Sequence, residues 1–206
     1  MSEKPRFAVL LDGGFVIKKF QQANKHFPTA AEIEGLCSTI TARPEFEGYE
    51  LLRNYFYHAT PASGVVVNPL DHSQTDLSAT RIHSQHESLV GRLELTPNFA
   101  VRLGETVAND WRLGSAAMKS LTQTLRPIQA ADLVPNITQK GVDLRIGMDI
   151  ARLSLREMVR AIVVVTGDSD LIPAFKFARR EGVRMYLECL GHGVRRDLKA
   201  HVDIVL

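Results

Sequence analysis

Two aspartates stand directly after a β-branched run late in the chain, in the octet Val163-Val164-Val165-Thr166-Gly167-Asp168-Ser169-Asp170. The apolar run predicts a buried parallel strand, which would bring Asp168 and Asp170 to its carboxyl end. In open α/β sheets, ligands bind at that edge. Two carboxylates with no basic residue between them repel each other unless a cation separates them. The pattern therefore predicts a hard divalent metal ion, whose commonest use is phosphate chemistry.

Two further aspartates are placed to join this pair. Asp12 ends a predicted strand over 7–11, and Asp143 follows Lys140-Gly141-Val142 at the start of a predicted helix. Asp12 and Asp168 can lie at the carboxyl edge of adjacent central strands, near the switch point of a doubly wound sheet. Four converging carboxylates favour Mg²⁺ or Mn²⁺, which take oxygen ligands and can activate a bound water.

A structural role competes with metal binding at each of these positions. An aspartate after a strand is often an N-cap or a turn former. Asp170 is a good N-cap candidate for the helix that follows, and Asp143 could complement a helix dipole. The two strand-ending acids taken together favour the metal site over the individual capping roles.

The remaining pattern predicts strands that alternate with helices. We expect strands over 7–11, 51–57, 99–103, 161–166, 183–189 and 202–206. We expect helices over 15–22, 30–40, 77–93, 115–125, 143–156 and 170–181, and a loop over 62–76. This alternation predicts a three-layer α/β sandwich with a mostly parallel central sheet, formed by right-handed crossovers. The 206 residues are predicted to form a single domain, with an insertion around 104–138.

Charge and composition limit the class of protein. The net charge is only +2, but residues 176–199 hold seven basic residues against three acidic ones, a net charge of +4. The two cysteines lack metal-site spacing, and no apolar run is long enough to cross a bilayer. We therefore expect a soluble, cytoplasmic protein with reduced thiols and no membrane partner, and a homo-oligomer is possible.

The chain resembles the NYN domain family, in its LabA-like branch. The motifs that carry the resemblance are Leu10-Leu11-Asp12-Gly13-Gly14, Lys140-Gly141-Val142-Asp143 and Val165–Pro173, and the closing residues 197–203 are also similar. It covers about the first 15 residues and residues 139–206. It implies a PIN-like, Rossmann-like fold and metal-dependent ribonuclease chemistry.

The resemblance also implies which residues form the site. Asp12, Asp143, Asp168 and Asp170 would form the catalytic metal site, and Thr166, where relatives commonly have Ser, would support it. Many relatives open with Asp-x-x-Asn, whereas this chain has Phe15 in place of the Asn. Asp149 matches a further acid of the family. It lies on a different face of the predicted helix from Asp143, so we favour a structural salt bridge with the arginines around it. For Asp203 a capping or hydrogen-bonding role is favoured.

Basic residues are predicted to bind RNA phosphates beside these acids. Arg195 and Arg196 follow a strand that should run parallel to the Asp168 strand, and Lys140 lies three residues before Asp143. A solvated turn is an equally open interpretation for the arginines.

These features predict a metal-dependent endoribonuclease that hydrolyses RNA phosphodiester bonds. Two alternatives stay open: a non-catalytic RNA-binding or regulatory interaction module, and a metal-dependent phosphohydrolase that acts on a small substrate. No phosphate-binding Gly-x-x-x-x-Gly-Lys loop, Gly-x-Gly-x-x-Gly or Gly-x-Ser-x-Gly motif is present.

Overall fold

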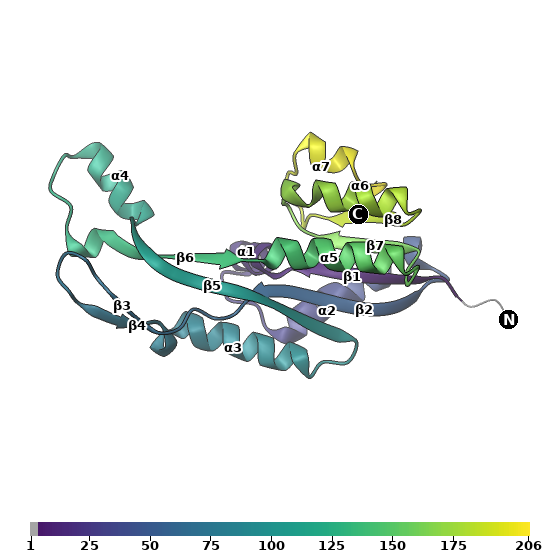
Figure 1. Cartoon of the computed structure of the whole chain (residues 1–206), viewed down its shortest axis with the longest axis horizontal. Helices are drawn as coiled ribbons and strands as arrows, with labels where there is room; N and C mark the ends of the chain where they lie inside the picture. The colour runs from purple at the N-terminus through teal and green to yellow at the C-terminus, as the bar shows by residue number, and fades with distance from the viewer. Residues whose placement is uncertain (1–3) are drawn as a thin grey trace. The chain divides into compact units, whose positions relative to one another are not determined.

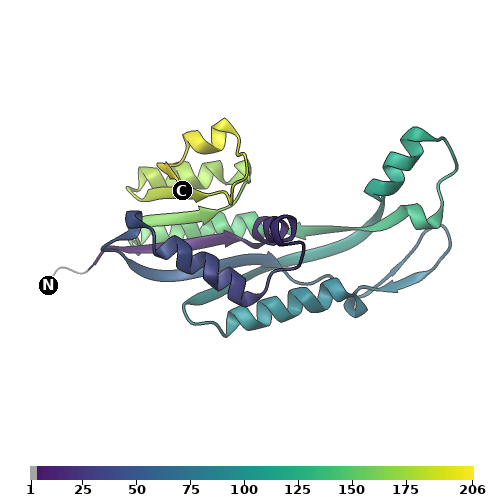
Figure 2. The ribbon, with the colours of Figure 1, turned by 180° about the vertical axis from the view of Figure 1, so that it is seen from behind.

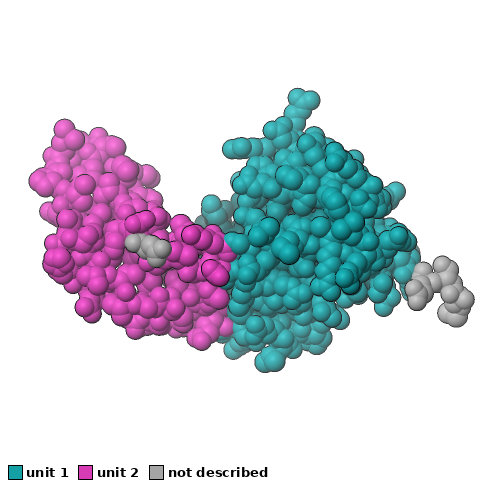
Figure 3. Space-filling view, viewed as in Figure 1, with its two compact units in different colours: residues 1–58, 88–104, 141–206 teal, residues 59–87, 105–140 magenta. Residues whose placement is uncertain are grey.

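The computed structural model describes residues 4–206, apart from the side chain of Asn109. The chain divides into two compact units (Figure 3). The first unit comprises Met1–His58, Ser88–Gly104 and Gly141–Leu206, and the second comprises Ala59–Glu87 and Glu105–Lys140. Residues 105–138, most of the predicted insertion, thus belong to the second unit together with residues 59–87.

Strands and helices alternate through most of the described chain (Figure 1). The strands are β1 (Arg6–Asp12), β2 (Glu50–Ala59), β3 (Val65–Val67), β4 (Gln74–Asp76), β5 (Phe99–Leu113), β6 (Leu133–Lys140), β7 (Ala161–Val165), β8 (Arg184–Glu188) and β9 (Ile204–Val205). The α-helices are α1 (Gly13–Asn24), α2 (Ala30–Thr41), α3 (Arg81–Glu94), α4 (Ser115–Gln123), α5 (Val142–Leu155), α6 (Ile172–Arg180) and α7 (Arg196–Ala200). A 3₁₀-helix, η4 (Ser169–Leu171), precedes α6.

The large sheet has the strand order β6-β5-β2-β1-β7-β8-β9. Strand β1 lies between β2 and β7 and is parallel to both, and β7, β8 and β9 continue the parallel arrangement. Strands β5 and β6 pair antiparallel. The sheet is therefore mostly parallel, as the sequence predicts. Because β1 and β7 are adjacent and parallel, their carboxyl ends meet at the same edge.

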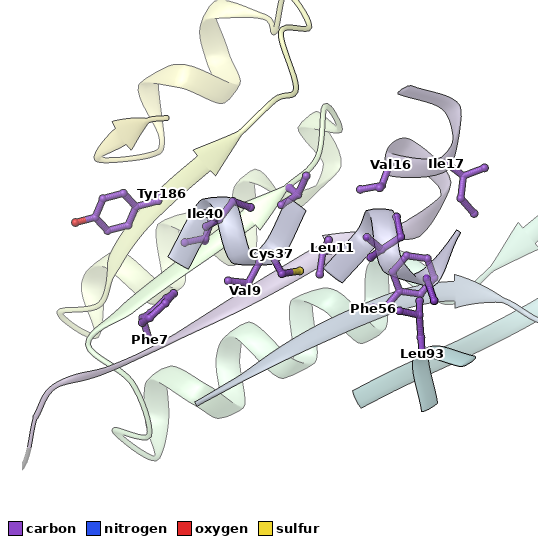
Figure 4. Packing of buried hydrophobic residues seen from close by; sticks show 14 of the residues in the cluster. Phe7, Val9, Leu11, Val16, Ile17, Cys37, Ile40, Phe56, Leu93 and Tyr186 are labelled. Carbon is purple, nitrogen blue, oxygen red and sulfur yellow. The ribbon is translucent and has the colours of Figure 1, made fainter. Parts of the chain in front are cut away.

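Helices cover both faces of the sheet in the first unit. Helices α5 and α6 pack against each other on one face (Figure 1), and α1 and α2 lie on the other (Figure 2). Val9 and Leu11 of β1 join the buried cluster under α2, where they meet Ile40 and Cys37 (Figure 4). The result is the three-layer α/β sandwich that the alternation predicts, in the PIN-like, Rossmann-like class.

Burial explains why β7 is a nearly continuous apolar run. All five of its residues are buried, because helices cover both sheet faces and strands lie on both sides. Burying one valine side chain contributes roughly 1.5–3 kcal/mol, so this strand is a strong anchor for the turn that follows it.

The second unit departs from the sequence-based expectations. Residues 62–76 are not only a loop, because β3 and β4 form a short antiparallel hairpin there. Its turn is held by Asn68, whose backbone N–H donates to Ser73 O at 2.9 Å and whose Oδ1 accepts from Leu70 N–H at 3.0 Å.

Strand β6 was not predicted, and β5 runs ten residues beyond the predicted end at 103. Pro135 within residues 133–140 argues against a central strand. However, β6 lies at the end of the strand order, where a missing N–H costs little.

Among the residues that the structure describes, no helix is both long enough and apolar enough to cross a lipid bilayer.

Candidate functional site

The candidate site lies at the carboxyl edge of β1 and β7. Leu11 and Val165 are register partners, so the next residues along each strand, Asp12 and Thr166, follow side by side. Asp12 is also the N-cap of α1, and its Oδ1 accepts from Phe15 N–H at 3.1 Å. The chain therefore turns sharply from strand to helix at this carboxylate and holds it at the sheet edge.

A continuous chain of hydrogen bonds connects Asp12 to the turn after β7. Thr166 Oγ1 donates to Asp12 Oδ2 at 3.0 Å and accepts from Asp168 N–H at 3.1 Å. Asp168 Oδ1 then accepts from Asp170 N–H at 2.9 Å. Thr166 is fully buried, and these bonds satisfy its hydroxyl as both donor and acceptor. The two turns are thereby held in one arrangement.

Asp143 approaches the same turn from α5. Gly141 precedes the helix with φ of 74°, a left-handed conformation that favours glycine, and Asp143 lies in the first helical turn. Helix α5 also contacts η4, which contains Asp170. The start of α5 thus faces the acidic turn, as the Lys-Gly-Val-Asp segment predicts.

The pKa shifts of Asp12 and Asp143 have acidic neighbours among their causes. Burial raises the pKa of Asp12, and the carboxylates of Asp143 and Asp168 raise it further, against the bonds from Phe15 and Thr166 that lower it. Burial also raises the pKa of Asp143, as do the carboxylates of Asp168 and Asp170. Asp12, Asp143 and Asp168 thus lie close enough to repel one another, with Asp170 beside Asp143.

The donor set fits a hard cation, but the described arrangement is not a closed coordination site. Carboxylate and hydroxyl oxygens are the ligands that Mg²⁺ and Mn²⁺ prefer. Among the described residues, however, no three His, Cys, Asp or Glu side chains are arranged to hold one ion. The structure thus brings the predicted acids together, and their role as metal ligands stays a prediction.

The predicted N-cap role of Asp170 is wrong. Asp168 is the residue that caps η4, with its side chain accepting from Asp170 N–H, and the cap position of α6 is Leu171. The 3₁₀ turn inserted before α6 explains the difference, because it moves the start of the α-helix two residues along the chain. Asp170 is exposed and makes no side-chain cap.

The predicted phosphate-binding residues are exposed. Arg195 occupies the N-cap position of α7 and Arg196 is its first residue. Both follow β8, which is parallel to β7 and ends at the same edge. Lys140 is the exposed last residue of β6 and belongs to the second unit.

Two other aspartates have structural roles, as the sequence analysis favours. Asp149 Oδ2 accepts from Tyr57 Oη at 2.8 Å and from Arg102 Nε at 3.3 Å. Its salt-bridge partner is therefore Arg102 and not an arginine of α5. Asp203 accepts from Met185 N–H at 2.8 Å and from Arg179 Nε at 2.9 Å.

Sequence reasoning assigned no role to three side chains that meet beside the acids. They are Phe15 and Lys19 of α1 and His192 of the turn after β8. Two signals in the sequence could have identified them. The first is spacing: Phe15 follows Asp12 by three residues and Lys19 follows Phe15 by four, so Phe15 and Lys19 lie on the face of α1 that begins at Asp12. His192 also follows a strand that ends at the acidic edge.

Comparisons with known proteins agree with this architecture. The model of the NYN domain matches residues 94–203, a span that includes Asp143, Asp168 and Asp170, whereas Asp12 precedes it. This span exceeds half of the chain, so the protein belongs to the NYN domain family.

One solved structure shares the fold. It is a crystal structure of a protein of unknown function from Vibrio parahaemolyticus, with 13% sequence identity and a TM-score of 0.56. The alignment covers 100% of this chain and 95% of the other. No curated protein matches the chain significantly. The likeness supports the fold and carries no information about activity.

Proposed function

We propose that this NYN domain protein is a metal-dependent endoribonuclease of the LabA-like branch. The membership in the NYN family supports a PIN-like nuclease, and the order of the three acidic motifs supports the branch. The observation that carries the proposal is the chain of hydrogen bonds that links Asp12, Thr166 and Asp168 at one sheet edge.

The charge on the acids gives the physical reason. Asp12 receives hydrogen bonds from two neutral donors, Phe15 N–H and Thr166 Oγ1, and among the described residues no ion pair to a basic side chain offsets its repulsion from Asp143 and Asp168. Such an arrangement is unfavourable unless a cation binds, and carboxylates that raise one another's pKa at one place are typical of functional sites.

Each residue has a defined task in this proposal. Asp12, Asp143, Asp168 and Asp170 would hold one or two Mg²⁺ or Mn²⁺ ions. The bound ion supplies a water of lowered pKa and stabilises charge on a phosphate. Thr166 fixes the position of Asp12 relative to the turn that carries Asp168, through its two hydrogen bonds. The basic residues at the same edge, Arg195 and Arg196, would bind the RNA backbone.

The test is cleavage of a mixed RNA pool by the purified protein with Mn²⁺, with EDTA, and in the Asp168→Asn variant. We expect cleavage that needs Mn²⁺ and falls at least about a hundredfold in Asp168→Asn, since even second-shell changes at metal sites cost 10–100-fold. Asp110→Asn is a matched control, because Asp110 is exposed and lies on β5 of the second unit. Equal cleavage by wild type and Asp168→Asn would reject the assignment.

One observation favours a second candidate function, an RNA-binding module without turnover. Phe15 stands where many relatives have Asn, so the first turn of α1 next to Asp12 carries an apolar side chain in place of that polar one. This candidate predicts salt-dependent RNA binding without cleavage at any Mn²⁺ concentration. The same experiment separates the two candidates, provided that binding is measured beside cleavage.

A further inference from the structure

Three side chains from two distant segments form a cluster beside the acids. Lys19 Nζ lies 2.9 Å from His192 Nδ1, and the two residues are 173 positions apart in the chain. The Phe15 and His192 rings meet edge to face, with centroids 6.1 Å apart and planes inclined at 61°. Lys19 Nζ also lies 5.7 Å from the centroid of the Phe15 ring. We call these three side chains the Lys19–His192 cluster.

The contact between Lys19 and His192 fixes the tautomer of the imidazole. An ammonium group has donors and no acceptor, so Nδ1 of His192 must accept. The neutral ring then carries its proton on Nε2, which becomes a second N–H donor. The cluster therefore offers two kinds of donor, the remaining N–H groups of Lys19 and the Nε2–H of His192, and a net positive charge.

Two backbone N–H groups hold the turn that carries His192, one bonded to a backbone carbonyl and one to a side-chain carboxylate. His192 N–H donates to Cys189 O at 2.8 Å, and Leu190 N–H donates to Glu188 Oε1 at 2.8 Å. Gly191 has φ of 69°, which favours glycine. His192 is exposed, so it can contact a ligand without a rearrangement of the core.

The cluster is directly connected to the acidic site. The backbone N–H of Phe15 donates to Asp12 Oδ1 at 3.1 Å. Gly167, which precedes Asp168, lies under the same rings: a Cβ there would come within 2.8 Å of Phe15 Cε2 and 3.3 Å of His192 Cδ2. The Lys19–His192 cluster therefore lies next to the acids and contacts them through Phe15 and Gly167.

We propose that Lys19 and His192 form a subsite for an RNA phosphodiester next to the one at the acids. The N–H groups of Lys19 and the Nε2–H of His192 are donors on neighbouring, accessible side chains, and together with the positive charge of Lys19 they match the oxygens of a phosphate backbone. The physical need is clear, because the aspartates repel a polyanion and a cation beside them offsets that repulsion. Phe15 is a positioning residue, because it holds the imidazole and ammonium without a donor of its own. The identity of the ligand as RNA rests on the proposed function.

Binding of a fluorescent single-stranded RNA of mixed sequence, measured by anisotropy in EDTA, tests the subsite without cleavage. We expect Lys19→Ala to weaken binding about tenfold, as for one hydrogen bond to a charged group. The slope of log K against log salt should also become less steep by about 0.7, the value for one lost phosphate contact.

Lys18→Ala is the matched control, since it removes the same charge from an exposed neighbouring position of α1. We expect this variant to stay within about twofold of wild type. Equal losses in Lys18→Ala and Lys19→Ala, no loss in either, or no RNA binding by the wild type would each overturn the subsite.

Two further measurements separate the roles within the cluster. Nitrogen NMR of His192 should show the Nε2–H tautomer in the wild type, because Lys19 donates to Nδ1, and an Nδ1–H tautomer would contradict the geometry. Phe15→Leu keeps apolar bulk beside Gly167 but removes the edge-to-face contact, so RNA binding should weaken less than in Lys19→Ala. Thermal unfolding of each variant monitors its fold.

The outcomes for the subsite and for the nuclease are distinguishable. If the protein binds RNA through Lys19 and His192 but never cleaves it, the proposed function fails and the subsite stands. If Mn²⁺-dependent cleavage depends on Asp168 while Lys19→Ala binds RNA like the wild type, the subsite fails and the nuclease stands.

Discussion

Asp132 in the second unit and Asp12 in the first unit have opposite surroundings. In the second unit, Asp132 accepts two bonds from Arg126, with Nη1–Oδ2 at 2.6 Å and Nη2–Oδ1 at 2.7 Å. The Arg126 guanidinium lowers the pKa of Asp132 to about 2. In the first unit, burial and neighbouring carboxylates raise the pKa of Asp12, which accepts from the neutral donors Phe15 N–H and Thr166 Oγ1.

The difference separates carboxylates that support the fold from those held for another purpose. Asp149 and Asp203 resemble Asp132, because each accepts from an arginine. Their charge is satisfied within the fold. Repulsion among the acids at the carboxyl edge persists in the folded protein, as is typical of residues retained for binding or catalysis. Whether an aspartate is paired with a basic side chain therefore says more about its role than its place at the end of a strand does.

The largest expected effect is stabilisation by a metal ion. Mn²⁺ that binds only the folded protein should raise its Tm, since a hundredfold excess over Kd contributes about 2.7 kcal/mol. Thermal unfolding with Mn²⁺ and with EDTA measures the shift. Asp132→Asn should keep this shift and Asp168→Asn should lose it. A shift of equal size in both variants would remove the distinction between the two kinds of aspartate.

Thr166→Val should lower the free energy of unfolding by about 1–3 kcal/mol. It leaves Asp12 Oδ2 and Asp168 N–H without their hydroxyl partner in a buried position. Cleavage should fall with it, because the two turns lose their connection. Urea unfolding and initial rates check both effects. Thr166→Ser keeps the hydroxyl, so its stability and cleavage rate should remain close to those of the wild type. If Thr166→Ser loses as much as Thr166→Val, the threonine methyl group and not the hydroxyl is responsible.

Neutralising one aspartate in each unit should change stability in opposite directions. Asn is as good an N-cap as Asp, so Asp168→Asn keeps the cap of η4 and removes repulsion on Asp12 and Asp143. We expect a gain of about 0.5–1 kcal/mol. Asp132→Asn loses the ion pair with Arg126 and should be less stable than wild type. If the urea midpoints of Asp168→Asn and Asp132→Asn move in the same direction, the two aspartates do not differ in their effect on stability.

The smallest expected effect is a pH dependence from Asp132. Its folded pKa of about 2 lies below the ordinary value of 3.8, so its contribution is complete above pH 3.8. The contribution is lost as the pH falls from 3.8 toward about 2. The stability difference between wild type and Asp132→Asn, measured by urea unfolding over this range, should shrink toward acid pH. A constant difference would show that the ion pair does not stabilise the fold.

Much of the first unit could be predicted from the sequence. The apolar runs of β1 and β7 are buried on both faces, so their pattern identifies them without knowledge of their neighbours. Asp12, Asp143 and Asp168 could be found because each stands where a strand ends or a helix begins. The N-cap of α6 could not, since 3₁₀ turns are frequent at the ends of α-helices and the one at Ser169–Leu171 moves the start of α6 to Ile172.

The second unit was less predictable for a related reason. Strand β6 is an edge strand with an intermediate or exposed surface at every position, so it lacks the alternation that identifies a half-buried strand. Hairpin β3–β4 is short, and only pairing between its strands defines it.

The sequence by itself determined which carboxylates this protein has and which strand and helix ends carry them, because local periodicity and turn chemistry encode both. Only the tertiary structure decided their partners: Arg102 for Asp149, Thr166 for Asp12 and His192 for Lys19. Hydrogen bonds and ion pairs act over about 3 Å, and strand order and register bring residues within that range from positions far apart in the chain.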